Sequence, residues 1–205
     1  MGKTSLAVRL ATQLAKDRAV TVLDQTGEYI SKRKMIAFDA AHNKAVNGIK
    51  VLEPTPGTIP PKSSLDYLNL LISIAKHEYQ NGTPLQRVVL IDEAHQFIPE
   101  PSGLGFSTPG RDESFKFGSL MMQIRKYRIT IILISQRTAV VAKSALSQCE
   151  NIIAFKNVDQ TGLDYLEAVA GHQARELLPI LQQGEALVFG PAISSNVPVV
   201  IKVMQ

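Results

Sequence analysis

The sequence predicts an α/β fold in which a mostly parallel sheet carries helices on both faces. Two segments, Arg87–Ile91 and Ile129–Ile134, are almost continuous apolar runs, which is typical of strands buried on both faces. Helical patterns alternate with such runs along the chain, as in sheets built from strand–helix–strand units. A length of 205 residues favours a single domain, spanning residues 1–205.

The first half of the chain begins with a predicted amphipathic helix, Lys3–Asp17, in which Leu6, Leu10 and Leu14 are one turn apart. A helix at Ser63–Tyr79 is expected to be capped by Ser63 or Ser64. Short strands are expected at Ala19–Leu23 and Val51–Leu52.

The second half contains the two apolar runs and a predicted mobile loop, Pro99–Arg111, which holds three prolines and three glycines. The remaining elements are predicted from shorter patterns. Helices are expected at Phe115–Tyr127, Ala139–Ser147, Asp159–Ala170 and His172–Leu181, and strands at Asn151–Phe155, Ala186–Phe189 and Val197–Val203.

Composition excludes several classes of protein. No run of 18 apolar residues exists, so no membrane-spanning helix is expected. A single cysteine, Cys149, excludes an internal disulfide and fits a reducing cytoplasm, and the four histidines lack metal-ligand spacing. The net charge of +4 permits contact with nucleic acid without demanding it.

The chain opens with Gly2-Lys3-Thr4-Ser5, which matches the second half of a phosphate-binding loop, GxxxxGK[ST]. In such a loop, amides at a helix N-terminus surround the phosphates of ATP, the lysine reaches the β- and γ-phosphates, and the threonine hydroxyl ligates Mg²⁺. A Gly-Lys-Thr triplet is also common by chance, and an ordinary first helical turn is the alternative interpretation.

Asp92 and Glu93 follow the apolar run Arg87–Ile91 directly. Adjacent acids at the end of a buried strand are costly unless a cation or substrate uses them. Asp92 is therefore predicted to hold the magnesium shell, and Glu93 to orient and deprotonate the attacking water. His95 is interpreted as structural.

The second apolar run ends at Ser135-Gln136, and Gln136 is the candidate sensor that bridges the γ-phosphate and the water. Arg125, Arg128 and Arg137 flank this strand, and we favour Arg125 as a guanidinium supplied across a subunit boundary. The alternative for Gln136 is an ordinary polar residue at a strand end, and the alternative for each arginine is an ordinary surface residue.

Taken together, these residues resemble the HerA-type ATPases of the HerA–FtsK superfamily. The similarity covers essentially the whole chain and is specific as a combination. It is carried by Asp24–Tyr29, matching the family's D-x-x-G-E-Y, by Asp92–Pro99, Arg125–Tyr127 and Ser135–Arg137, and by the ending Gly184–Val188 with Pro198-Val199.

The resemblance implies a RecA-like P-loop NTPase fold, ATP and Mg²⁺ as ligands, a homo-oligomeric ring (usually a hexamer), and movement along duplex DNA. Relatives work with a nuclease in end resection, or in conjugation, antiviral defence or viral genome packaging. Surfaces for DNA are expected at Lys32–Lys34, at Arg111 and Lys116, and at Lys143.

Two features depart from the family pattern. The first half of the phosphate loop and its strand do not precede Gly2, and the N-terminal barrel domain is absent. We expect weak ATP binding without that half-loop, and exposed apolar edges where its strand would lie inside the sheet. Two alternatives to an active motor therefore stay open: a nucleotide-silent structural ring subunit and a viral genome-packaging ATPase.

Overall fold

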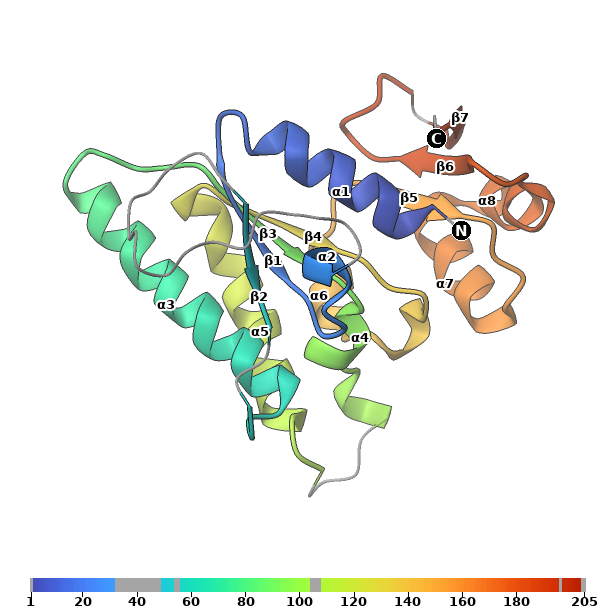
Figure 1. Ribbon diagram of the computed structural model, residues 1–205. Helices are drawn as coiled ribbons and strands as arrows, with labels where there is room; N and C mark the ends of the chain where they lie inside the picture. Colours follow the sequence, from blue (N-terminus) through green and yellow to red (C-terminus); the bar gives the residue numbers. More distant parts are fainter. Residues whose placement is uncertain (1, 32–48, 54–55, 104–107, 196, 204–205) are drawn as a thin grey trace.

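A four-stranded parallel sheet forms the centre of the molecule, in the order β2-β1-β3-β4 (Figure 1). The computed structural model describes residues 2–31, 49–53, 56–103, 108–195 and 197–203. The strands span Ala19–Leu23 (β1), Ile49–Leu52 (β2), Arg87–Ile91 (β3) and Ile129–Leu133 (β4). All three pairings are parallel, so the carboxyl ends of the strands meet at one edge of the sheet.

Helices cover both faces of this sheet, as predicted. On one face α1 (Lys3–Leu14) buries Ala7 and Ala11 against Val20, Val22 and Leu90. On the other face α3 (Pro60–Gln80) and α5 (Arg111–Ile124) bury the larger core, which includes Leu68 and Phe117. The α/β fold of RecA-like P-loop NTPases is therefore present.

The C-terminal strands form a separate sheet, which the sequence did not predict. Strands β5 (Ile152–Phe155), β6 (Glu185–Phe189) and β7 (Val199–Lys202) pair antiparallel in that order. Helices α7 (Gln160–Ala170) and α8 (His172–Leu177) pack on it around Leu163, Leu178 and Leu187. Short apolar runs predict strands but do not encode the direction in which they pair.

Several detailed expectations were wrong. The single helix expected at Ala139–Ser147 is a 3₁₀ turn, Thr138–Val140, followed by a separate four-residue helix, Lys143–Leu146. The helix α3 begins at Pro60, before the expected serine cap, because proline is favoured in the first helical turn. The Ser64 hydroxyl instead donates to the carbonyls of Pro61 and Phe97. Strand β4 was expected to be buried on both faces, yet Thr130 is exposed and Ile131–Leu133 are only partly buried.

The remaining elements are short. They are α2 (Glu28–Ser31), α4 (Ala94–Phe97), α6 (Lys143–Leu146) and the 3₁₀ turns η1 (Pro101–Gly103), η2 (Arg125–Tyr127), η3 (Thr138–Val140) and η4 (Leu178–Ile180). Within the described ranges, no helix has the length and apolar character needed to cross a lipid bilayer.

Candidate functional site

Strand β3 brings Asp92 and Glu93 to the edge where the parallel strands end. Glu93 adopts a left-handed conformation (φ 49°, ψ 49°), which is uncommon for a residue other than glycine. The Glu93 amide donates to Asp92 Oδ1 at 2.9 Å, and the Ala94 amide donates to the Ile134 carbonyl at 2.7 Å. This turn stops β3, starts α4 and ties the end of β3 to the end of β4.

Glu93 contacts Gln136, the residue that lies just beyond β4. Gln136 Nε2 donates to Glu93 Oε1 at 2.8 Å, so the predicted base and the predicted sensor lie side by side. His95 Nδ1 lies 3.2 Å from Glu93 Oε2, and both atoms are buried without a hydrogen bond to any residue that the structure describes. The sequence analysis interpreted His95 as structural. The left-handed turn at Glu93, which brings His95 back beside it, is not encoded in the local sequence pattern.

Asp92 is buried in an acidic environment. Its side chain retains 7% exposure, and burial raises its pKa above the ordinary value of 3.8. The hydrogen bond from the Glu93 amide and the nearby Tyr29 hydroxyl lower the pKa, and the charges of Glu93 and Asp24 raise it. Such a carboxylate is stabilised by a bound cation.

Tyr29 and Asp24 form the wall beside Asp92. The Tyr29 hydroxyl is buried, and burial together with the nearby Asp92 charge raises its pKa far above the ordinary value. Both Asp24 oxygens are already used: Oδ1 accepts from the Thr26 amide and hydroxyl, and Oδ2 from the Tyr29 amide, each at 2.9 Å. Asp24 therefore holds the Asp24–Tyr29 turn in place.

The helix α1 presents an open N-terminus at Gly2–Ser5. Its N-cap, Gly2, has φ 143° and carries no capping side chain, and the first turn contains no acidic residue. A Cβ on Gly2 would lie 2.9 Å from the Phe155 ring, so both the backbone angle and the close contact require glycine. The amides of Lys3, Thr4 and Ser5 and the positive end of the helix dipole can therefore face an anion.

A groove of about 850 Å³ links α1 to the end of β4, since Lys3 and Ser135 both line it. Ser135 immediately precedes Gln136 in the chain. Lys3 and Ser135 thus border one groove, which Asp92, Glu93 and Gln136 do not line, and Ser135 and the two acids lie at the edge of the sheet where the parallel strands end. This is the edge at which ligands bind in open α/β folds.

Arg125 lies in the turn that precedes β4, at the opposite end of the strand from Ser135 and Gln136. Its side chain is 86% exposed and pairs with Glu150 at 2.8 Å. The structure therefore does not bring Arg125 to Glu93 within one chain.

The basic residues expected to meet DNA occupy different positions. Arg111 and Lys116 lie on α5, with the Arg111 guanidinium 5.7 Å from the Phe115 ring, and Lys143 begins α6. Lys32–Lys34 fall outside the described residues.

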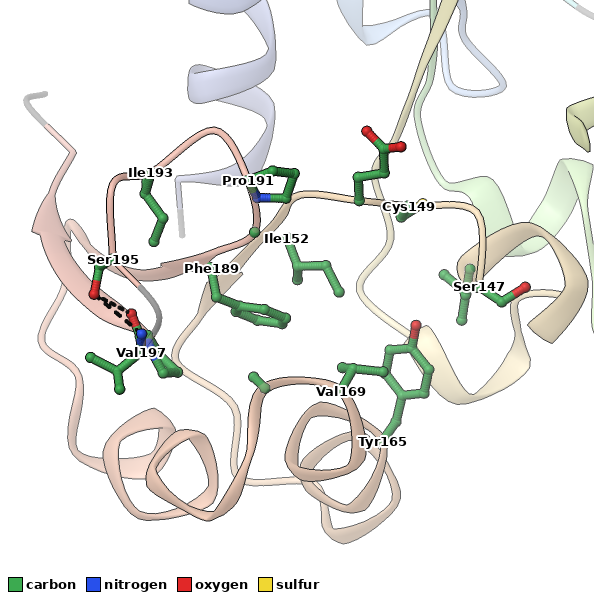
Figure 2. Close-up of a pocket in the computed structure, with 15 residues that line it drawn as sticks. Ser147, Cys149, Ile152, Tyr165, Val169, Phe189, Pro191, Ile193, Ser195 and Val197 are labelled. Atoms are coloured by element: carbon green, nitrogen blue, oxygen red, sulfur yellow. Dashed lines mark hydrogen bonds between the residues drawn. The ribbon is translucent and has the colours of Figure 1, made fainter. Parts of the chain in front are cut away.

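A second cavity, of about 440 Å³, lies away from these residues (Figure 2). It is lined by the loop after β6 and by Tyr165 and Val169 of α7, and it contains Cys149. Burial raises the pKa of the Cys149 thiol, which keeps it protonated and unreactive at neutral pH. None of the predicted site residues reaches this cavity.

Comparison with known proteins supports the fold. No family model matches the chain. The genome-packaging NTPase of Sulfolobus turreted icosahedral virus 2, solved with AMPPCP, is similar over 100% of this chain and 93% of its own, at 19% identity and a TM-score of 0.68. The conjugation coupling protein TcpA of pCW3, solved with ATPγS, is similar over 96% of this chain and 55% of its own, at 14% identity and a TM-score of 0.62.

One curated relative is detected by sequence. A protein named as a probable helicase of Methanocaldococcus jannaschii is 33% identical over 82 residues, which is 38% of this chain. The match spans 16% of that protein's length. At these identities the structural similarities establish the RecA-like P-loop NTPase fold, and the activity has to be argued from the site.

Proposed function

We propose that this chain is an ATP-hydrolysing DNA motor subunit of the HerA–FtsK type, with a single RecA-like core over residues 1–205. The observation that carries the proposal is the contact between Glu93 and Gln136, made from the ends of two neighbouring strands beside buried Asp92. The open N-terminus of α1 at the same edge supplies amides and Lys3 for phosphate.

The residues present fit ATP and Mg²⁺. Lys3 and the amides of Gly2–Ser5 would hold the phosphates, as in other phosphate loops. The Thr4 hydroxyl and Asp92 carboxylate are oxygen donors of the kind Mg²⁺ prefers. Binding the cation would also offset the burial of Asp92 and, to a smaller extent, the charges of Glu93 and Asp24, which together raise its pKa. When bound, Mg²⁺ neutralises charge on the transferring phosphoryl group.

Glu93 would act on the water. Its Oε1 is held by a hydrogen bond from Gln136, and its Oε2 lies 3.2 Å from His95 Nδ1, so Gln136 restrains the carboxylate and His95 limits the space beside it. A fixed carboxylate can orient a water and accept its proton, while the Gln136 amide can contact the γ-phosphate. His95 is thereby added as a positioning residue.

The test is Glu93→Gln, assayed for steady-state ATP hydrolysis and separately for nucleotide binding by calorimetry. Turnover should fall by at least about a hundredfold, the usual contribution of a general base, while the affinity for ATP changes little. Glu176→Gln, at an exposed glutamate on α8, is the matched control. A loss below about tenfold would exclude Glu93 as the base.

Activity should require a ring, in which Arg125 of one subunit reaches the site of its neighbour. Its position away from Glu93, at the opposite edge of its own sheet, suits a contact made between subunits. Mixing Arg125→Ala subunits with Glu93→Gln subunits should restore hydrolysis at interfaces that combine the two intact residues. A fully active monomer would contradict this assembly.

Duplex DNA is the proposed substrate, contacted without sequence preference by Lys32–Lys34, Arg111, Lys116 and Lys143. Affinity should fall steeply with salt, and removing one contacting lysine should reduce the log–log slope by roughly one unit. A nuclease is a candidate partner, and the single cysteine suits a cytoplasmic setting. Binding that ignores salt would argue against DNA.

Genome packaging is the second candidate role. It is favoured by the similarity to the viral packaging NTPase, which extends over nearly the full length of both chains. A nucleotide-silent ring subunit is the third, and it is the outcome expected if neither Glu93→Gln nor wild type hydrolyses ATP in an assembled ring.

A further inference from the structure

Tyr29, on α2, is a fully enclosed tyrosine beside the acids at the carboxyl edge of the sheet. Its exposed fraction is 0%, and its ring packs in the core under α1 with Val22 and Leu90. The hydroxyl oxygen is buried and completes no hydrogen bond with any residue that the structure describes. A buried hydroxyl without a partner is costly, so its position requires an explanation.

The register of the central strands places Tyr29 next to Asp92. Leu23 of β1 pairs with Ile91 of β3, and the Asp92 amide donates to the Leu23 carbonyl at 3.1 Å. Asp24 and Asp92, the residues that follow these two strands, therefore lie side by side. Asp24 Oδ2 accepts from the Tyr29 amide at 2.9 Å, which holds the start of α2 against the strand ends.

The charges around the phenol decide its protonation state. Burial, and then the charge of Asp92, raise the pKa of Tyr29 far above its ordinary value, so the hydroxyl keeps its proton and can act only as a neutral donor or acceptor. In the other direction, burial raises the pKa of Asp92 and the Tyr29 hydroxyl opposes that rise. The hydroxyl therefore favours the ionised carboxylate, which is the form that a cation requires.

Asp92 lacks a second donor to fix its orientation. In the described part of the chain, its side chain accepts one hydrogen bond, from the Glu93 amide to Oδ1 at 2.9 Å. A single bond leaves the carboxylate able to rotate. Carboxylates that bind metals are themselves held by hydrogen bonds, and removing such a partner typically weakens metal binding about 10–100-fold. The Tyr29 hydroxyl is the buried donor placed to supply this restraint.

We propose that Tyr29 is a positioning residue for the cation: its hydroxyl donates to the ionised Asp92 side chain and holds that carboxylate in the orientation that faces Mg²⁺. Tyr29 acts through Asp92 and needs no contact with the nucleotide. The role toward Mg²⁺ rests on the proposed ATPase function, whereas the hydrogen bond between Tyr29 and Asp92 does not.

The hydrogen bond is tested without nucleotide by a double-mutant cycle of Tyr29→Phe and Asp92→Asn, measured by urea unfolding at pH 7. Tyr29→Phe removes one oxygen and keeps the packed ring. In wild type it should reduce the folding equilibrium constant about tenfold, as expected for a hydrogen bond to a charged group. In the Asp92→Asn background the reduction should be at least about threefold smaller, because the carboxylate is gone.

Tyr67→Phe is the matched control. It removes a hydroxyl that donates to Thr21 Oγ1 at 2.7 Å, within β1 rather than at its end. This variant should also lower stability, but its effect should be the same with and without Asp92→Asn. The comparison separates the loss of a tyrosine hydroxyl from the loss of a contact with Asp92.

The role toward the cation is tested by electron paramagnetic resonance of Mn²⁺ binding in the presence of ATP, which does not depend on turnover. Tyr29→Phe should weaken Mn²⁺ binding at least about tenfold, while ATP binding without metal stays unchanged. Tyr67→Phe should bind Mn²⁺ as wild type does.

Two results would overturn the proposal: an effect of Tyr29→Phe that is equal in both backgrounds of the cycle, or unchanged Mn²⁺ affinity in a protein whose wild type binds the metal with ATP. Coupling in the cycle without any binding of Mn²⁺ and ATP by wild type is a different outcome. It would keep the hydrogen bond and contradict both the proposed ATPase function and the metal role of Tyr29.

Discussion

Strands β3 and β4 are neighbours with five residues each and similarly apolar sequences, but they differ in how completely they are enclosed. Every residue of β3 is buried, with Leu90 and Ile91 at 0% exposure. In β4 only Ile129 is fully buried. The cause is pairing, because among the described residues β3 has a strand on each side whereas β4 has one on a single side.

The difference shows that an apolar run predicts a strand whose side chains can be buried on both faces. How much of that strand is actually buried depends also on the number of strands that pair with it. β4 has the composition of an inner strand and the position of an edge strand. The carboxyl end of β4 also borders the proposed site, since Ser135 and Gln136 lie just beyond it.

The largest expected effect is on stability: Ile91→Ala should lower the free energy of unfolding more than Ile131→Ala does. Both side chains belong to the core beneath α3 and α5, but Ile91 is fully buried and Ile131 only partly. Ile91→Ala should cost about 4 kcal/mol of unfolding free energy and Ile131→Ala about half of that, because a fully enclosed side chain leaves the larger cavity when it is truncated.

Urea unfolding of the two variants measures this difference. Equal costs in the free protein would show that β4 is already enclosed as fully as β3.

The second prediction compares two ion pairs near the beginnings of β3 and β4. Arg87, at the start of β3, is 8% exposed and makes a bidentate ion pair with Glu78. Glu78→Gln leaves a buried guanidinium poorly paired and should cost about 2 kcal/mol. Glu150→Gln, which removes the exposed partner of Arg125 before β4, should cost less than about 0.5 kcal/mol.

The Glu78 effect has a defined pH dependence. Its hydrogen bonds with Arg87 lower the pKa of Glu78 below the ordinary 4.5. The ion pair therefore stabilises the protein fully above that value, and the stabilisation is lost as pH falls through the lowered pKa. The variant and wild type should converge in strongly acidic solution, and a constant difference down to such pH would contradict the ion-pair explanation.

The sequence predicted correctly those elements that depend on local patterns of residues. The spacing of Leu6, Leu10 and Leu14 predicted α1, and the apolar run before Asp92 predicted β3, because both patterns are local. The contact of Glu93 with Gln136 followed from parallel strands ending at one edge, so the type of fold was enough to predict their proximity.

What the sequence did not predict depends on non-local geometry. The antiparallel pairing of β5–β7 requires knowledge of the chain's return path, which short apolar runs do not contain. The approach of His95 to Glu93 depends on a left-handed turn at a residue that rarely adopts one. Propensities describe the common conformation, and sites often use the uncommon one.

The smallest expected effect is at the end of β3, where the carboxylate of Asp92 is buried. Asp92→Asn should stabilise the ligand-free protein by about 1 kcal/mol at pH 7, since a neutral amide is cheaper to bury beside Asp24 and Glu93 than a carboxylate. Because burial raises the pKa of Asp92, the native state holds its proton more tightly than the unfolded state does. Wild-type stability should therefore fall as pH rises from the ordinary 3.8 through the raised value.

The gain from Asp92→Asn should consequently be absent at pH values below 3.8, grow through that window and then level off, as measured by urea unfolding across pH. Thr21→Val, at a buried polar residue of β1, serves as a control without a titrating group. The same Asp92→Asn change should remove the stabilisation that MgATP gives to wild type, because the asparagine no longer offers a charge to the cation. A variant less stable than wild type at pH 7 would mean that the Asp92 carboxylate already supports the fold, as Asp24 does, and the magnesium role would have to be assigned elsewhere.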